Sequence, residues 1–75
     1  MPPMRVDLIE QQRFAEARYA KYTGSARSLL QDADWNSHRG NWSEAANKLH
    51  AALESVAAAA GVCRELNLIY LLRED

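Results

Sequence analysis

The stretch His38-Arg39-Gly40-Asn41-Trp42-Ser43-Glu44 decides the fold of this 75-residue chain, because it combines a helix-ending signal with a helix-starting signal. Glycine tolerates the left-handed backbone that commonly closes an α-helix, so Gly40 is expected just after a helix end. Asn41 is a favoured N-cap residue, and Glu44 stands three residues later, where a capping-box partner belongs. A connection of about two residues forces the flanking helices to fold back on each other. The sequence therefore predicts an antiparallel helical hairpin.

One long helix is predicted before this turn, over residues 7–39. Asp7 is its candidate N-cap, and residues 1–6, which include both prolines, are expected to form an N-terminal tail. Mainly apolar residues follow a 4-3 spacing along one side of the segment, as in helices that pack against a partner helix. These positions are Leu8, Gln12, Ala15, Tyr19, Tyr22, Ala26, Leu29 and Ala33. Thr23-Gly24 lowers helix propensity by ~1 kcal/mol at the glycine, which leaves open a bend or a break at that point.

Two further helices are predicted after the turn, over residues 42–60 and 62–73, with Gly61 as the residue that ends the first of them. An apolar stripe on residues 42–60 is assigned to the core: Trp42, Ala45, Leu49, Ala52, Val56 and Ala59. The apolar run after Gly61 also fits a short strand, but the chain offers no second strand-like segment to pair with it. The expected fold class is therefore all-α, a helical hairpin with a short third C-terminal helix, in one domain over residues 1–75.

The small size of the chain predicts association with another molecule. A lone hydrophobic core of this length supplies only ~3–5 kcal/mol of stability. Cys63 is the only cysteine, so no disulfide can form within the chain. We expect a dimeric bundle, with large apolar residues of the tail in the interface; docking of a different partner on the same tail is left open. The expected interface residues are Leu66, Leu68, Tyr70, Leu71 and Leu72.

The charge balance argues against a general nucleic-acid binder. Nine basic and ten acidic residues give a net charge of −1, whereas such binders carry a basic excess. A locally basic stretch, Arg13–Arg27, keeps a helical nucleic-acid-associated regulator as the alternative function. The N-terminus lacks the apolar run of a signal peptide, and the longest uninterrupted apolar stretch, residues 56–63, is far shorter than the ~20 residues that span a bilayer. We expect a cytoplasmic protein with a reduced thiol and no membrane association.

The turn region, residues 34–42, is the most chemically varied part of the sequence. Trp and Arg are over-represented at binding hot spots, which makes Trp35, His38 and Arg39 the candidate partner-binding residues. The alternative is purely architectural: Trp35 would pack across the end of the bundle, Trp42 would begin the core stripe, and the polar residues would be solvated.

No catalytic, cofactor-binding or metal-binding motif is recognisable in the sequence. His38 and His50 belong to different predicted helices and are twelve residues apart, so solvated histidines are expected rather than a metal-binding pair. Cys63 is expected to be a small core residue. We expect no cofactor, no bound metal and no enzymatic activity.

Two family resemblances involve residues 26–60. The segment Gly40-Asn41-Trp42-Ser43-Glu44-Ala45, followed by Leu49, Ala52 and Leu53, resembles the second helix of a tetratricopeptide hairpin, although the family's pattern in the preceding helix and its closing proline are missing. Residues 26–60 are also similar to the nucleotide-binding helical domains called HEPN, through Ala45-Ala46-Asn47-Lys48. Catalytic HEPN members place a histidine four to six residues after an arginine. Neither histidine here has that arginine, so ribonuclease activity is not implied.

The expected function is therefore that of a small non-enzymatic regulatory or adaptor protein, of the inhibitor, antitoxin or accessory-subunit type. Such a protein acts by binding a protein partner. Both resemblances imply a binding hairpin rather than a catalyst.

Overall fold

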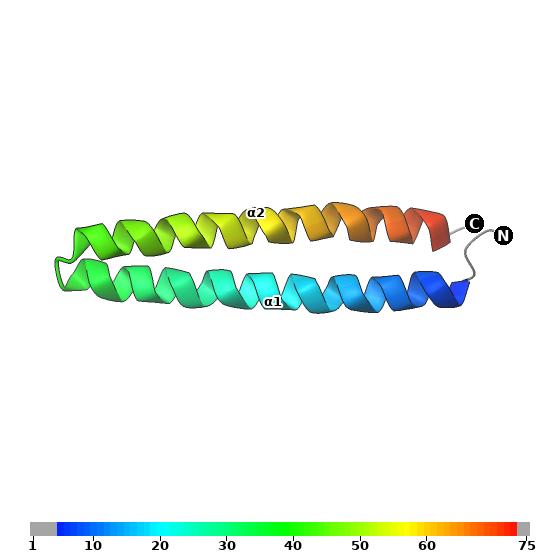
Figure 1. The fold of residues 1–75 in the computed structure, drawn as a ribbon, viewed down its shortest axis with the longest axis horizontal. Coiled ribbons are helices and arrows are strands. Elements are labelled where there is room, and N and C mark those ends of the chain that lie inside the picture. The colour runs from blue at the N-terminus through cyan, green and yellow to red at the C-terminus, as the bar shows by residue number, and fades with distance from the viewer. Residues whose placement is uncertain (1–4, 74–75) are drawn as a thin grey trace.

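The computed structural model describes residues 5–73, which form two long helices packed side by side (Figure 1). Helix α1 spans Arg5–His38 and helix α2 spans Trp42–Arg73. The molecule measures 58 × 16 × 14 Å. The beginning of α1 and the end of α2 lie at the end of the hairpin opposite the turn (Figure 1). The predicted all-α antiparallel hairpin is confirmed.

The turn has the geometry that its sequence predicts. Gly40 has a φ of +76°. The backbone N–H groups of Gly40 and Asn41 donate to the carbonyls of Ser37 and Asn36 at 3.0 and 2.9 Å, the bonding pattern of a Schellman motif. Asn41 then caps α2, because its side-chain oxygen lies 3.4 Å from the backbone nitrogen of Glu44. Backbone carbonyls at the end of α1 and a backbone N–H at the start of α2 therefore find hydrogen-bond partners within the turn.

Helix α1 buries the side that its 4-3 spacing predicts. Leu8, Ala15, Ala26 and Ala33 are buried, and Gln12, Tyr22 and Leu29 are partly buried; Tyr19, the remaining predicted position, is exposed. The helix is continuous through Thr23-Gly24, where the Thr23 hydroxyl donates to the carbonyls of Tyr19 and Ala20. Packing in one phase along the whole seam offsets the low helix propensity of the glycine.

The prediction of a third helix is wrong, because α2 continues through Gly61 to Arg73. Gly61 does not have a positive φ and therefore does not act as a helix-ending residue. The packing side explains the continuity. Ala59 on one side of the glycine and Val62 and Ile69 on the other are all buried in a single heptad phase. Burial of these residues against α1 offsets the ~1 kcal/mol cost of a mid-helix glycine.

The predicted core stripe of α2 is half correct. Ala45, Ala52 and Ala59 are buried, but Trp42 is 68% exposed, and Leu49 and Val56 are exposed as well. The seam of α2 follows a different phase: Ala45, Lys48, Ala52, Ser55, Ala59, Val62, Leu66 and Ile69. The half of this seam nearer the turn buries the small residues Ala45, Ala52 and Ala59, which favours a close approach of the two backbones. Farther from the turn, Val62 and Ile69 pack against Ala15 of α1.

The expected start of α1 needs correction. Arg5 and Val6 are helical, so Asp7 lies inside the first turn and is not the N-cap. A carboxylate at this place interacts favourably with the positive end of the helix dipole. The remainder of the predicted tail, residues 1–4, lies outside the described residues.

Candidate protein-binding surfaces

The interior of the hairpin is narrow, and most large apolar side chains lie outside it. Six of the nine buried hydrophobic residues in the described part of the chain are alanines. The tightest cluster consists of Ala15, Val62 and Ile69, with Tyr22 and Leu66 packed against it. The large exposed hydrophobic residues are Phe14, Tyr19, Leu30, Trp35, Trp42, Leu49, Leu53, Val56, Leu68, Tyr70, Leu71 and Leu72.

Many of these exposed residues form a second regular seam on α2, which we call the outer seam. It follows the same 4-3 spacing as the seam that faces α1, but every one of its positions is exposed. Its members are Trp42, Ala46, Leu49, Leu53, Val56, Ala60, Cys63, Asn67 and Tyr70. A heptad seam of this kind is the pattern with which a helix packs against another helix. Helix α2 therefore presents two packing sides, of which α1 covers one.

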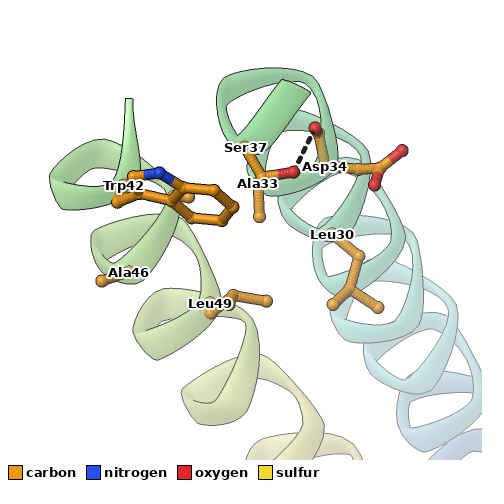
Figure 2. Close-up of a pocket in the computed structure, with 8 residues that line it drawn as sticks. Leu30, Ala33, Asp34, Ser37, Trp42, Ala46 and Leu49 are labelled. Atoms are coloured by element: carbon orange, nitrogen blue, oxygen red, sulfur yellow. Dashed lines mark hydrogen bonds between the residues drawn. The ribbon is translucent and has the colours of Figure 1, made fainter. Parts of the chain in front are cut away.

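An apolar hollow of about 420 Å³ lies where the outer seam approaches the turn. Figure 2 shows Trp42 and Leu49 of α2 facing Leu30 of α1 across it. Ser37 lies at its rim, where the Ser37 hydroxyl donates to the carbonyl of Asp34 at 2.7 Å. The lining is almost entirely hydrocarbon, so the hollow suits an apolar side chain rather than a polar small molecule.

The predicted partner-binding residues form a small cluster at the end of α1. The Arg39 guanidinium carbon lies 4.4 Å from the centre of the Trp35 ring, a cation–π contact, and Trp35 remains 60% exposed. His38 is exposed, and its Nδ1 lies 2.7 Å from the carbonyl of Asp34, so the Nδ1–H tautomer donates to that carbonyl. The architectural alternative requires Trp35 to pack across the end of the bundle, and its exposure shows that it does not.

The predicted interface residues at the end of α2 divide into two groups. Leu66 packs against the core cluster, so it is occupied within the hairpin. Leu68, Tyr70, Leu71 and Leu72 are exposed. Tyr70 belongs to the outer seam, whereas Leu68 lies on the other side of α2 and lines a hollow with Arg18 and Glu65.

The basic stretch of α1 is partly neutralised by nearby acidic side chains. Arg18 makes an ion pair with Glu65 of α2, which neutralises one of its four basic residues. Glu16, also exposed, lies among the others. This arrangement gives little support to the nucleic-acid alternative.

The described residues hold no cluster of three or more potential metal ligands. His50 is exposed, as expected. Cys63 is exposed too, so its assignment to the core is wrong: Val62 takes the position that faces α1. By length and composition alone, α2 is apolar enough to cross a membrane, although its most apolar part contains Arg64 and Glu65.

Comparisons with protein-family models, curated proteins and solved structures found no match to this chain. The tetratricopeptide-like and HEPN-like resemblances accordingly have no support beyond the residues that suggested them.

Proposed function

We propose that this chain is a small non-enzymatic binding protein, of the regulatory, adaptor or accessory-subunit type, that acts through contacts with a protein partner. The observation that carries the proposal is the distribution of its apolar residues. Alanines fill the space between the helices, while both tryptophans and most large aliphatic side chains lie on the surface. Soluble monomers rarely expose contiguous apolar surface on this scale without a binding role.

The Trp35–Arg39 pair is the proposed contact with that partner. A tryptophan held flat under a guanidinium combines a large apolar area with a charged hydrogen-bond donor, the combination found at interface hot spots. The hydrogen bond from His38 to the Asp34 carbonyl holds the imidazole ring of His38 in place beside this pair. Preorganised side chains lose less entropy on binding, which favours affinity.

The alternative of a nucleic-acid-associated regulator receives less support, because Arg18 is paired with Glu65 and the net charge is −1. A membrane role would require Arg64, Glu65 and Asn67 to enter the apolar layer. Charged groups near the bilayer centre cost ~2.5–3.5 kcal/mol each. We therefore propose a protein partner in the cytoplasm.

Affinity capture from the native host with the wild-type chain, Trp35→Ala and Arg39→Ala tests this proposal. Both variants should lose the captured protein by at least ~10-fold while keeping the wild-type circular dichroism spectrum, because hot-spot truncations cost ~2 kcal/mol or more. Phe14→Ala is the matched control, since Phe14 is an equally exposed aromatic residue of α1 that lies far from the turn. Capture that persists in both Trp35→Ala and Arg39→Ala would contradict the proposed contact.

A further inference from the structure

The outer seam of α2 has the regular spacing of an interface between helices, which a non-specific apolar surface lacks. From Trp42 to Tyr70 it runs without a phase change through the same length of helix that packs against α1. Asn67 is its only polar member. An occupant that matches it along its length must be a helix of similar length and spacing, because knobs-into-holes packing requires the same repeat on both sides.

The side-chain sizes along the outer seam favour one direction of pairing. Its two alternating sets of positions differ in size. The first set is mostly large and comprises Trp42, Leu49, Val56, Cys63 and Tyr70. The second is mostly small and comprises Ala46, Leu53, Ala60 and Asn67. In a parallel pair of identical helices, large residues would meet large ones and small residues small ones, leaving alternately crowded and empty layers. In an antiparallel pair, Trp42, Leu49, Val56 and Cys63 each meet a member of the second set, which gives layers of even width. Tyr70, the fifth member of the first set, lies beyond these layers.

The isolated, elongated hairpin exposes more surface than a compact monomer of its mass. Its accessible surface is 5828 Å², about a quarter more than the ~4,700 Å² expected for a folded monomer of this mass. The radius of gyration is 16.9 Å, against ~11 Å for a compact chain of this length. The excess area is somewhat larger than the ~800 Å² that each partner buries in a standard interface.

We propose that a second copy of this chain covers the outer seam, with the two α2 helices antiparallel, so that two hairpins form a four-helix bundle. The two-fold axis passes between Glu54 and Ser55. In this register Leu53 meets Val56 of the second copy, and Leu49 meets Ala60 of the second copy. Trp42 then lies opposite Asn67, where its indole N–H can donate to the amide oxygen. A register shifted by one heptad would place this polar amide against Leu49 instead.

This inference rests on the proposed binding function and names the assembly that performs it. In the antiparallel dimer the two turns lie at opposite ends of the bundle, so two Trp35–Arg39 pairs face away from each other. A dimer of this shape can bind two partner molecules at once. The apolar hollow between Leu30, Trp42 and Leu49 would be filled by side chains of the second copy.

Disulfide trapping tests the direction and the register together. Ala46→Cys places a thiol opposite the native Cys63 of the second copy, so mild oxidation of this variant should give a covalent dimer in high yield. The control, Ala46→Cys/Cys63→Ser, should remain uncrosslinked; a covalent dimer in the control would indicate a parallel pair and overturn the proposal. Leu53→Cys should not crosslink to Cys63, because these two positions meet only in the register shifted by one heptad. A covalent dimer of Leu53→Cys would therefore overturn the proposed register.

Oligomeric state tests which side of α2 is used. Light scattering of the wild-type protein at micromolar concentration should give twice the monomer mass of 8.5 kDa. Leu53→Glu should abolish the dimer, because two glutamates would be buried near the axis. Leu68→Glu, at a residue equally exposed on the opposite side of α2, should leave the dimer intact. A monomeric wild-type protein, or dissociation by Leu68→Glu and not by Leu53→Glu, would overturn the proposal, as would recovery of the protein only with lipid or detergent.

The dimer and the partner-binding function can fail separately. Trp35→Ala should abolish partner capture and leave the dimer mass unchanged, because Trp35 lies outside the outer seam. A wild-type monomer that still captures a partner through Trp35 and Arg39 would refute the dimer and leave the proposed function standing. A crosslinked dimer that captures no partner through Trp35 would support the dimer and refute the proposed function.

Discussion

Gly40 is the residue on which the hairpin depends most directly. Its φ of +76° lies in the left-handed region, and its amide closes the last turn of α1. Gly40→Val should destabilise the fold by more than ~1–2 kcal/mol. An ordinary residue loses about that much free energy in the left-handed backbone conformation, and a β-branched residue loses more. Chemical denaturation of both proteins measures the difference. An unchanged unfolding midpoint would mean that the turn does not require positive φ at this position.

Asn41 contributes at the same turn through its side chain. Asn41→Ala removes the oxygen that accepts from the Glu44 amide and should cost about 1 kcal/mol. Asn41→Asp keeps an acceptor next to the positive helix end and serves as the matched control, with stability close to the wild type. A loss of stability in Asn41→Asp as large as that in Asn41→Ala would assign the effect to the Asn36–Asn41 side-chain contact instead.

At the scale of the helix, Gly61 decides whether α2 is one element or two. It lies inside the helix, is exposed, and has open space where a Cβ would stand. Gly61→Ala should therefore stabilise the protein by up to ~1 kcal/mol, through higher helix propensity and a less flexible unfolded chain. Gly24→Ala should behave in the same way in α1. A destabilised Gly61→Ala, measured by thermal unfolding, would support the helix end that the sequence predicts after residue 60.

The two helices differ in how far their sequences predict their packing. In α1 one apolar spacing stands against a polar background, so the buried positions Leu8, Ala15, Ala26 and Ala33 follow from the pattern. In α2 two apolar seams run in parallel, and Trp42 and Leu49 are individually better core candidates than Ala45 and Ala52. The choice depends on what fits between two closely approaching backbones, which favours alanine. Size complementarity with α1 is a tertiary property, and single-residue hydrophobicity does not reveal it.

The candidate site shows the same limit. The turn chemistry identifies Trp35, His38 and Arg39 by residue type. The structure adds the Trp35–Arg39 stacking, which depends on their four-residue spacing across the end of α1. The sequence does not reveal the outer seam as a separate surface, although its spacing is visible, because the core assignment takes Trp42, Leu49, Val56 and Cys63 from it. Only the burial of Ala45, Ala52 and Ala59 separates the two seams.

For the molecule as a whole, folding and assembly should be coupled. Between residues 7 and 73 no large side chain is fully buried within one hairpin, and a core filled mainly with alanines gains little from the removal of apolar surface. Leu49, Leu53 and Val56 of the outer seam are exposed in the hairpin and become buried only in the proposed dimer. The melting temperature should therefore rise with protein concentration. A 100-fold increase adds ~2.7 kcal/mol by mass action, equivalent to a shift on the order of 5–10 °C.

Calorimetry or circular dichroism over that concentration range measures the shift in melting temperature. Leu68→Glu is the control that should keep the shift, and Leu53→Glu is the variant that should lose it. A wild-type melting temperature independent of concentration would show that the hairpin is stable alone, and its exposed leucines would then have no part in folding.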